Sequence, residues 1–380
     1  MIDSTIGIYV HIPFCKSICP YCDFDRQAHG FERIPRYLEA LVTDIQRAMP
    51  HTAHSVFFGG GTPSLLTGTQ VGSILDACRE SIGVADDAEI TLEANPGDLT
   101  VDLVEEYVSA GVNRMSLGVQ SFDDATLQML GRRHVGDEAR HAFRTIRAGG
   151  IQNASLDLMY GLPGMDSDHW RRTLDSALEL EPDHLSCYLL TVDERVPMGR
   201  DVMAGRLSLP ADEQTEVQYR DTMQRLAEAG YEHYEISNWA LPGRASRHNL
   251  TYWLDQPYLA FGSGAAGSYN GRRWKNHPSP DRYMDTIKDD GQPAHIEDET
   301  MDEETRLADF VSLQLRLREG LSRSQFQCRF GRSIDDVLGA ELRALQSDGV
   351  LEEEGDRLRV TRDWVFVTNE VLARLLAGIE

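Results

Sequence analysis

The stretch YVHIPFCKSICPYCDF, residues 9–24, carries three of the six cysteines in this chain of 380 residues. Cys15, Cys19 and Cys22 stand in the spacing CxxxCxxC. Three thiolates on one tight loop can hold three corners of a cubane iron–sulfur cluster, whose irons prefer cysteine sulfur. The fourth iron then lacks a protein ligand and stays open to a small molecule, as a catalytic metal keeps an open position. The spacing therefore predicts a 4Fe–4S cluster with one free coordination site.

Two other roles for these three cysteines are compatible with the sequence. A zinc site would need a fourth ligand, for which His11 or His29 lies nearby. Structural zinc usually takes its ligands from two separated CxxC-like hairpins, and the sequence offers no second half of that kind. Three unliganded thiols at this spacing are the other alternative. Both are weaker readings than a cluster.

The remaining cysteines, Cys78, Cys187 and Cys328, are scattered through apolar surroundings. Free cysteine is among the most often buried residue types, so we expect all three inside the protein. This distribution is typical of a metal site in a reducing compartment and not of a disulfide framework.

The N-terminus lacks a signal-peptide pattern and no run of about 18 apolar residues occurs, which predicts a soluble, cytoplasmic protein.

The chain is strongly acidic. Its formal net charge is −24, and arginine supplies almost all of the positive charge because only three lysines are present. Such a charge repels phosphate backbones, so the composition argues against nucleic-acid binding.

The first 240 residues alternate short apolar runs with amphipathic helical patterns at intervals of about 30 residues, the rhythm of repeated βα units. Strands are predicted over residues 7–12, 55–58, 89–93, 114–120, 154–160 and 185–190. Helical patterns include residues 35–49, 101–110, 138–148 and 170–180. The sequence therefore predicts an α/β protein with a parallel sheet covered by helices, either a complete barrel or a partial one.

Polar and glycine residues stand at or just after the carboxyl ends of these strands. The cysteines follow the first strand, the segment Gly59-Gly60-Gly61-Thr62-Pro63 follows the second, and Glu93 and Gln120 close the third and fourth. Asp157 lies in the fifth strand. In a βα barrel this is the face on which active sites are built, so we expect these residues to meet at one mouth. Taken alone, the glycine segment is equally consistent with a tight turn.

After residue 240 the rhythm breaks. Residues 241–300 are rich in glycine, proline and aromatic residues, and we expect an irregular segment there. From residue 301 to 380, three helical patterns precede two short strands around a glycine-containing turn, which suggests a small winged-helix-like domain. The acidic character of this domain disfavours DNA binding and favours a role in packing or in docking a partner.

The cluster loop, with its flanks YVHIPFC and CPYCDF, resembles the radical-SAM proteins. Within them it is similar to the family of oxygen-independent coproporphyrinogen dehydrogenases and HemW-type haem chaperones. The resemblance implies a partial (β/α)6 TIM-like barrel in which the open iron binds the amino and carboxylate groups of S-adenosylmethionine (SAM). One-electron reduction of such a cluster cleaves the sulfonium and yields a 5′-deoxyadenosyl radical.

The same resemblance implies a SAM pocket built from several strand ends. Its residues would be Tyr9, Tyr21, Gly60, Gly61, Thr62, Glu93, Gln120, Arg132 and Asp157. The charges are sensible independently, because a bound zwitterion needs an anion such as Glu93 near its ammonium and a cation such as Arg132 near its carboxylate. Any one of these residues alone could be an ordinary surface ion pair.

Two features separate the members of the family. The dehydrogenases continue CxxxCxxCxC and carry a long N-terminal extension, whereas this chain has Phe24 at the last position and starts six residues before its first strand. The haem chaperones carry HNxxYW, which here reads His248-Asn249-Leu250-Thr251-Tyr252-Trp253. The resemblance implies a haem-site role for His248, since imidazole is a sound axial ligand and the neighbouring rings offer flat apolar surface. Without the family, an ordinary loop histidine is the better reading.

The sequence thus favours a haem-binding protein that delivers haem to acceptor haemoproteins, such as those of the respiratory chain, with a SAM-bound cluster supporting the transfer. Porphyrinogen oxidation is not expected, and a radical-SAM methylase or haem-degrading enzyme is the remaining alternative. Contact with a membrane through the acceptors and formation of a homodimer are left open.

Overall fold

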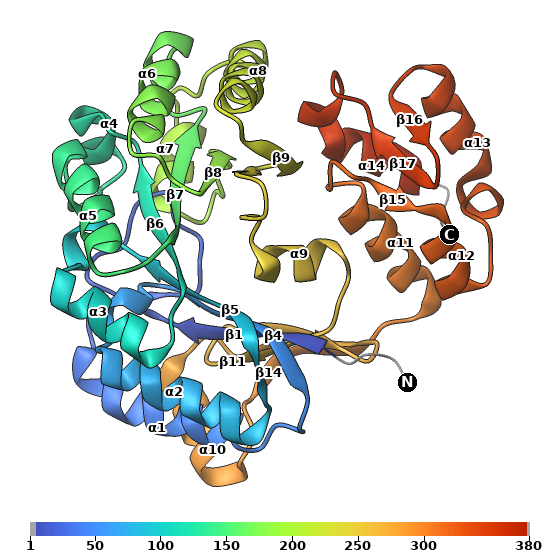
Figure 1. The fold of residues 1–380 in the computed structure, drawn as a ribbon. Coiled ribbons are helices and arrows are strands. Elements are labelled where there is room, and N and C mark those ends of the chain that lie inside the picture. Colours follow the sequence, from blue (N-terminus) through green and yellow to red (C-terminus); the bar gives the residue numbers. More distant parts are fainter. Residues whose placement is uncertain (1–4, 378–380) are drawn as a thin grey trace.

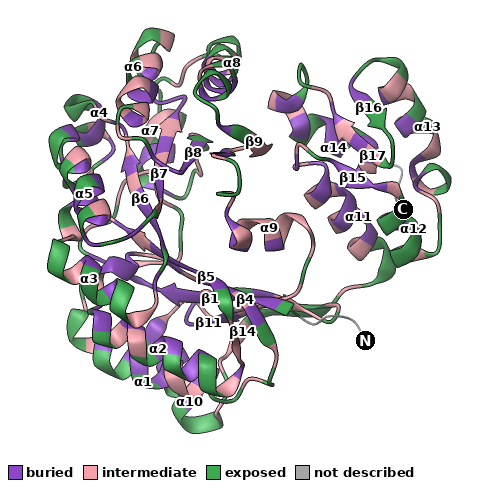
Figure 2. Cartoon of the chain, viewed as in Figure 1, coloured by how far each residue is buried: buried purple, intermediate pink, exposed green. Residues whose placement is uncertain are grey.

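Six parallel strands form the centre of the molecule. The computed structural model describes residues 5–377, and in it the six strands neighbour one another in chain order. They are β1 (Thr5–Ile12), β4 (Thr52–Gly60), β5 (Val84–Ala94), β6 (Arg114–Gln120), β7 (Asn153–Tyr160) and β8 (His184–Leu189). Most of their side chains are buried, as expected for a parallel sheet covered on both faces (Figure 2). All six predicted strands are confirmed, and β5 starts five residues earlier than predicted.

The sheet remains open and wraps around part of its own chain. Antiparallel strands β10 (Asn238–Ala240) and β9 (Glu232–Glu235) extend it beyond β8. Within residues 5–377 its outer strands are β14 (His295–Thr300) on one side and β9 on the other. Figure 1 shows the curved sheet partly surrounding helix α9 (Arg247–Trp253). The predicted partial barrel is therefore confirmed.

Amphipathic helices cover the outer face of the sheet (Figure 1). Their apolar stripes pack on the strands, and side-chain caps fix several starts; for example, Thr67 and Gln70 form a reciprocal capping box. The helices before residue 240 are α1 (Ile34–Ile45), α2 (Gly68–Ser81), α3 (Val101–Ala110), α4 (Asp124–Met129), α5 (Gly136–Ala148), α6 (Ser167–Leu178), α7 (Pro197–Met203) and α8 (Asp212–Glu228).

Residues 241–300 are ordered into regular elements, so the prediction of an irregular segment is wrong. They form α9, β11 (Tyr258–Phe261), β12 (Ala266–Tyr269), β13 (Arg272–Asn276), α10 (Pro280–Asp290) and β14 (His295–Thr300). Strand β11 pairs in parallel with β1, and α10 buries Tyr283, Met284 and Ile287 in the same core as the barrel. The strands are four to six residues long and separated by glycines with positive φ, which hides their periodicity.

The C-terminal region has a core of its own. Helices α11 (Glu303–Gln314), α12 (Arg323–Phe330), α13 (Ile334–Ser347) and α14 (Thr368–Leu376) pack with a small sheet in the order β15 (Leu321–Ser322), β17 (Arg357–Val360), β16 (Leu351–Glu354). The predicted helices followed by a hairpin are present.

Cys78 and Cys187 are buried as expected, but Cys328 is exposed. Phe326 faces the core from α12, and Cys328, two residues later, lies on another face of that helix.

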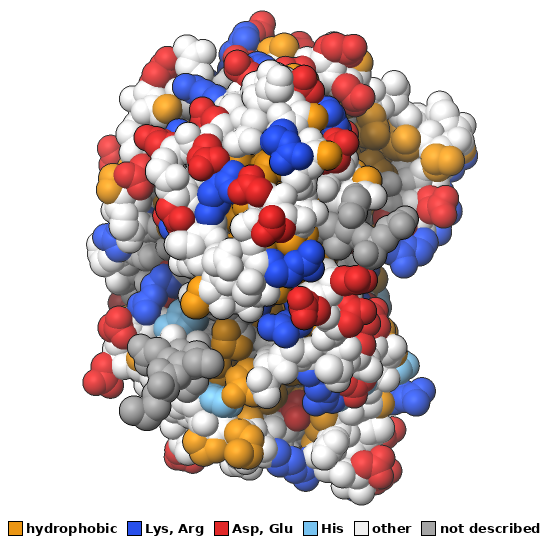
Figure 3. Space-filling model, turned by 90° about the vertical axis from the view of Figure 1, so that its right-hand side faces the viewer, with side chains coloured by type: hydrophobic (Ala, Val, Ile, Leu, Met, Phe, Trp, Pro, Cys, Tyr) orange, Lys and Arg blue, Asp and Glu red, His pale blue; other side chains and the backbone are white. Residues whose placement is uncertain are grey.

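The surface carries its charge in a mixed pattern. Acidic and basic side chains are interspersed on the face shown in Figure 3. No helix among residues 5–377 combines the length and the apolar character needed to span a bilayer.

The buried carboxyl group of Asp44 links α1 to α10, and its pKa predicts that the stability of the fold depends on pH. The Tyr283 hydroxyl donates a 2.6 Å hydrogen bond to Asp44, and burial raises the pKa of Asp44 to about 6. Between about pH 4 and pH 6 the folded chain keeps a proton that the unfolded chain has lost. The free energy of unfolding should therefore fall by about 3 kcal/mol as the pH rises through this window.

Urea unfolding at a series of pH values tests this expectation. Asp44→Asn keeps an acceptor for Tyr283 and should flatten that part of the pH profile, whereas Asp289→Asn, exposed on α10, should leave it unchanged. Equal slopes in the wild type and in Asp44→Asn would show that this carboxyl group does not hold the extra proton.

Candidate functional site

A cavity of about 390 Å³ opens at the carboxyl ends of the parallel strands. Its size is within the range of small-molecule sites. It brings together most of the residues predicted from the sequence: Cys15, Cys19, Tyr21, Cys22, Gly60, Gly61, Thr62, Glu93, Gln120, Arg132 and Asp157. Tyr9 and His248 do not line this outer cavity and lie in a second one beneath it.

The three cysteines lie on a loop whose two ends are tied together. Strand β2 (Phe14–Cys15) pairs with β3 (Gln27–Ala28), and the Cys22 amide donates a 3.1 Å hydrogen bond to the Cys19 carbonyl. The Met198 amide also donates to the Pro20 carbonyl, which joins the loop to α7. The short chain between the paired ends directs all three cysteines to one cavity.

Hydrogen-bond donors from two other elements reach the sulfurs. The Thr62 hydroxyl lies 3.5 Å from Cys15 Sγ, and Arg132 Nη1 lies 3.7 Å from Cys19 Sγ. Burial raises the pKa of the Cys15 and Cys22 thiols, so both are protonated until a cationic centre displaces the protons. Donors aimed at sulfur stabilise a bound thiolate, and these residues therefore fit an iron–sulfur cluster.

The zinc alternative finds no support in the described residues. His11 is neutral because burial lowers its pKa, and both ring nitrogens are used: Nε2 donates to the Asp25 carbonyl at 2.7 Å, and Nδ1 accepts from the Tyr9 hydroxyl at 3.0 Å. His29 is exposed and does not line the cavity. Within residues 5–377, no three His, Cys, Asp or Glu side chains are grouped to hold a single ion. The corners of a cubane spread its thiolates further apart than a single ion would.

The glycine segment passes close to the cysteine loop. Gly60 has a φ of +108°, and a Cβ placed there would lie 2.5 Å from the His11 ring. A Cβ on Gly61 would lie 2.8 Å from the Phe14 carbonyl oxygen. Only glycine allows this approach, so the segment is more than a tight turn. Through its hydrogen bond, Tyr9 steadies the His11 ring from the inner side.

Two buried acids stand beside each other in the cavity wall. Burial, followed by the neighbouring Asp157, raises the pKa of Glu93 to about 8. Asp157 accepts a 2.9 Å hydrogen bond from Ser116, and its pKa is also raised by burial. Glu93 is thus largely protonated at neutral pH until a cation arrives, and it can ionise to meet one.

Arg132 and Gln120 keep buried polar atoms without a protein partner. Arg132 donates through Nη2 to Asn95 at 2.5 Å and to the Gly118 carbonyl at 2.6 Å, yet its Nε has no acceptor. The Gln120 Oε1 atom likewise lacks a donor. Such unsatisfied groups call for an explanation, and a zwitterionic ligand in the cavity would provide partners for both.

Sequence reasoning missed Asn95 and Ser116. Asn95 donates to Thr62 at 3.0 Å and accepts from Arg132, so it connects two of the predicted residues. Ser116 orients Asp157. A signal for Asn95 was present, since it follows Glu93 by two residues at the same strand end.

The inner cavity has a volume of about 210 Å³ and shares Glu93, Ser116, Asp157 and Tyr188 with the outer one. His248 lines it but is only 1% exposed. Its Nδ1 lies 2.9 Å from Ser55 Oγ, and its Nε2 lies 2.8 Å from the Tyr252 hydroxyl. Neither ring nitrogen is free for iron in this structure. Trp253 packs elsewhere, under Arg316, so the two rings of the motif do not form one flat surface.

Comparisons with known proteins agree with this geometry. Residues 9–177 match the Radical SAM superfamily, and residues 301–363 match the HemN C-terminal domain. A Bacillus subtilis protein named "Heme chaperone HemW" is 35% identical over 98% of this chain and 99% of its own length. An Escherichia coli protein of the same name is 35% identical over 98% of both chains.

The chain belongs to the HemW family. This confirms the resemblance predicted from the cluster loop and HNxxYW. The radical-SAM character of the HemW family implies a 4Fe–4S cluster and SAM, for which the outer cavity has suitable residues. The fold also matches the coproporphyrinogen III oxidase HemN from Escherichia coli, with a TM-score of 0.85 at 21% identity over 99% of this chain and 91% of that one. At this identity the match shows a common fold.

Proposed function

We propose that this protein binds haem and delivers it to acceptor haemoproteins, while a SAM-bound cluster in the outer cavity supports the transfer. Similarity to proteins named heme chaperone HemW over nearly the whole chain is the observation that carries the proposal. We place the protein in the cytoplasm and its acceptors among respiratory haemoproteins, which it would meet at the membrane surface. A homodimer belongs to the same hypothesis.

Each part of the outer cavity has a role in this proposal. Cys15, Cys19 and Cys22 would hold the cluster, which when bound supplies one electron to the SAM sulfonium. Thr62 and Arg132 donate to the sulfurs and so hold negative charge on them.

The glycines and charged side chains would hold SAM. Gly60 and Gly61 let the methionyl end approach the backbone, and Tyr21 covers the cluster side of the cavity. Glu93, next to Asp157, would lose its proton and accept a hydrogen bond from the SAM amino group. Gln120 and the unpartnered Nε of Arg132 offer polar contacts to the rest of the ligand.

Haem titration tests the proposed function. We expect the protein to bind haem stoichiometrically, with a Soret band that saturates at a fixed ratio of haem to chain. Anaerobic incubation of cluster-loaded protein with SAM, dithionite and coproporphyrinogen should give no protoporphyrinogen. Failure to bind haem, or turnover of the porphyrinogen, would contradict the proposal and favour an enzyme.

A further inference from the structure

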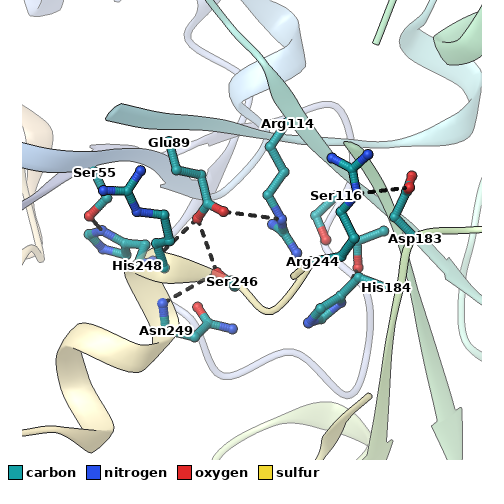
Figure 4. Close-up of polar contacts among 12 residues, drawn as sticks. Ser55, Glu89, Arg114, Ser116, Asp183, His184, Arg244, Ser246, His248 and Asn249 are labelled. Atoms are coloured by element: carbon teal, nitrogen blue, oxygen red, sulfur yellow. Dashed lines mark hydrogen bonds and ion pairs between the residues drawn. The ribbon is translucent and has the colours of Figure 1, made fainter. Parts of the chain in front are cut away.

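Helix α9, which carries the HNLTYW segment, closes the inner cavity from below. It packs against β1 and β4 towards the amino-terminal ends of the strands, opposite the side on which the outer cavity opens. The Glu89 carboxylate of β5 accepts from Ser246 Oγ at 3.4 Å and from the His248 amide at 3.3 Å (Figure 4). An anion at the start of a helix complements the helix dipole, so Glu89 holds α9 in place. On its other side Glu89 faces Arg114 at 3.9 Å.

The imidazole of His248 is shielded from solvent, with only 1% of the residue exposed. Ser55 and Tyr252 occupy its two nitrogens, and Phe57 stacks on it with 5.1 Å between ring centroids. A Cβ on Gly7 would lie 3.3 Å from His248 Cε1 and 3.2 Å from Thr251 Cγ2. Burial lowers the pKa of His248 to about 3, so the ring is neutral and matches one donor and one acceptor.

His184 shows that this chain uses the same arrangement for a purely internal histidine. Its Nδ1 lies 2.7 Å from Ser155 Oγ, and its Nε2 lies 2.8 Å from the Tyr234 hydroxyl. It is fully buried in β8. In both His184 and His248, therefore, one ring nitrogen contacts a serine hydroxyl on an adjacent strand and the other contacts a tyrosine hydroxyl.

The space next to His248 is too small for haem. The inner cavity of about 210 Å³ is about half the volume of the outer one and lies below the range of about 300–1,000 Å³ that holds drug-sized ligands, which are smaller than haem. Ligation would also break one of two buried hydrogen bonds and leave Ser55 or Tyr252 without its partner.

We infer that His248 is a positioning residue and not the haem-iron ligand: it fixes α9 as the floor of the inner cavity and thereby places Asn249 and Tyr252 opposite Glu93. The haem half of this inference rests on the proposed function. The positioning half rests on the cavities, because Glu93 lines both and a displaced floor changes the wall that would hold SAM.

The haem half is tested by spectroscopy on His248→Gln. Glutamine retains a donor and an acceptor but is a poor iron ligand, so the Soret maximum and the ferric haem EPR spectrum should match those of the wild type. The melting temperature should fall by about 3–8 °C, as it should in the matched control His184→Gln. A changed EPR spectrum in His248→Gln, with His184→Gln unchanged, would overturn the inference.

Gly7→Ala gives an independent answer if His248→Gln does not fold. It keeps the imidazole but presses a methyl group against His248 and Thr251. We expect an unchanged haem spectrum and an affinity of cluster-loaded protein for SAM about three- to tenfold weaker than in the wild type. The weakening should recur in His248→Gln and be absent from His184→Gln, which shares the loss of stability but not the position.

The measurements distinguish a failure of the positioning role from a failure of the proposed haem function. Wild-type SAM affinity in both Gly7→Ala and His248→Gln would overturn the positioning role. If the wild type binds no haem, the proposed function fails together with the haem half, and the SAM measurement still decides the positioning half.

Discussion

Replacing Cys19 by alanine is expected to abolish the iron–sulfur cluster while leaving the chain folded. With two thiolates remaining, a cubane would have two irons without protein ligands, and chelation from this loop would be lost. The fold should survive because the barrel core is built from strand and helix side chains and does not include Cys19. Iron and acid-labile sulfide, measured after anaerobic reconstitution, should fall from about four of each per chain to near zero.

Cys328→Ser is the matched control for this experiment. Cys328 is exposed in the C-terminal region, far along the chain from the cluster loop, and its replacement should leave iron and sulfide unchanged. Full iron and sulfide in Cys19→Ala would mean that the loop does not hold the cluster. Zinc without iron or sulfide in the wild type would restore the zinc alternative.

The barrel and its mouth could be predicted because their signals are local. A parallel strand buried on both faces is a short apolar run, and the residue that ends it can be read directly from the sequence. Since parallel strands share one carboxyl edge, Glu93 and Gln120 had to meet the cysteine loop that follows β1. Convergence on one cavity was therefore a consequence of topology.

The directions of interior side chains could not be predicted in the same way. The family resemblance placed Tyr9 in the SAM pocket, but its ring lines the inner cavity and its hydroxyl donates to His11. The environment of His248 depends on Ser55 and on the insertion of α9 inside the curved sheet, contacts that join residues almost 200 positions apart. No local pattern reports such a contact.

The strands after α9 escaped prediction for a related reason. Strand β11 has only four residues, and its place beside β1 is set by the register in which Gly7 faces Tyr258. Gly262 follows it with a φ of +103° and turns the chain towards Tyr37. The glycines that made the segment look irregular are the residues that allow its sharp turns.

Glu93→Gln should weaken SAM binding by about 10- to 100-fold. The glutamine side chain keeps the size of the carboxylate but loses the negative charge that would face the SAM amino group, so a charge-assisted hydrogen bond becomes a neutral one. Equilibrium dialysis or calorimetry on cluster-loaded protein measures the loss. Glu80→Gln, exposed on α2, is the control and should bind SAM within about twofold of the wild type.

The pH dependence of SAM binding separates this role from simple packing. Burial and Asp157 raise the pKa of Glu93 to about 8, so below that pH the free site must lose a proton before the carboxylate can accept from the SAM amino group. Between pH 6 and 8 the wild-type affinity should therefore rise more steeply than that of Glu93→Gln, by up to about tenfold per pH unit, because only the wild type has this proton to lose. Above about pH 8 the carboxyl group is already ionised, and the two profiles should run parallel. Profiles that are also parallel below pH 8, with Glu93→Gln binding equally well, would place the amino group away from this carboxylate.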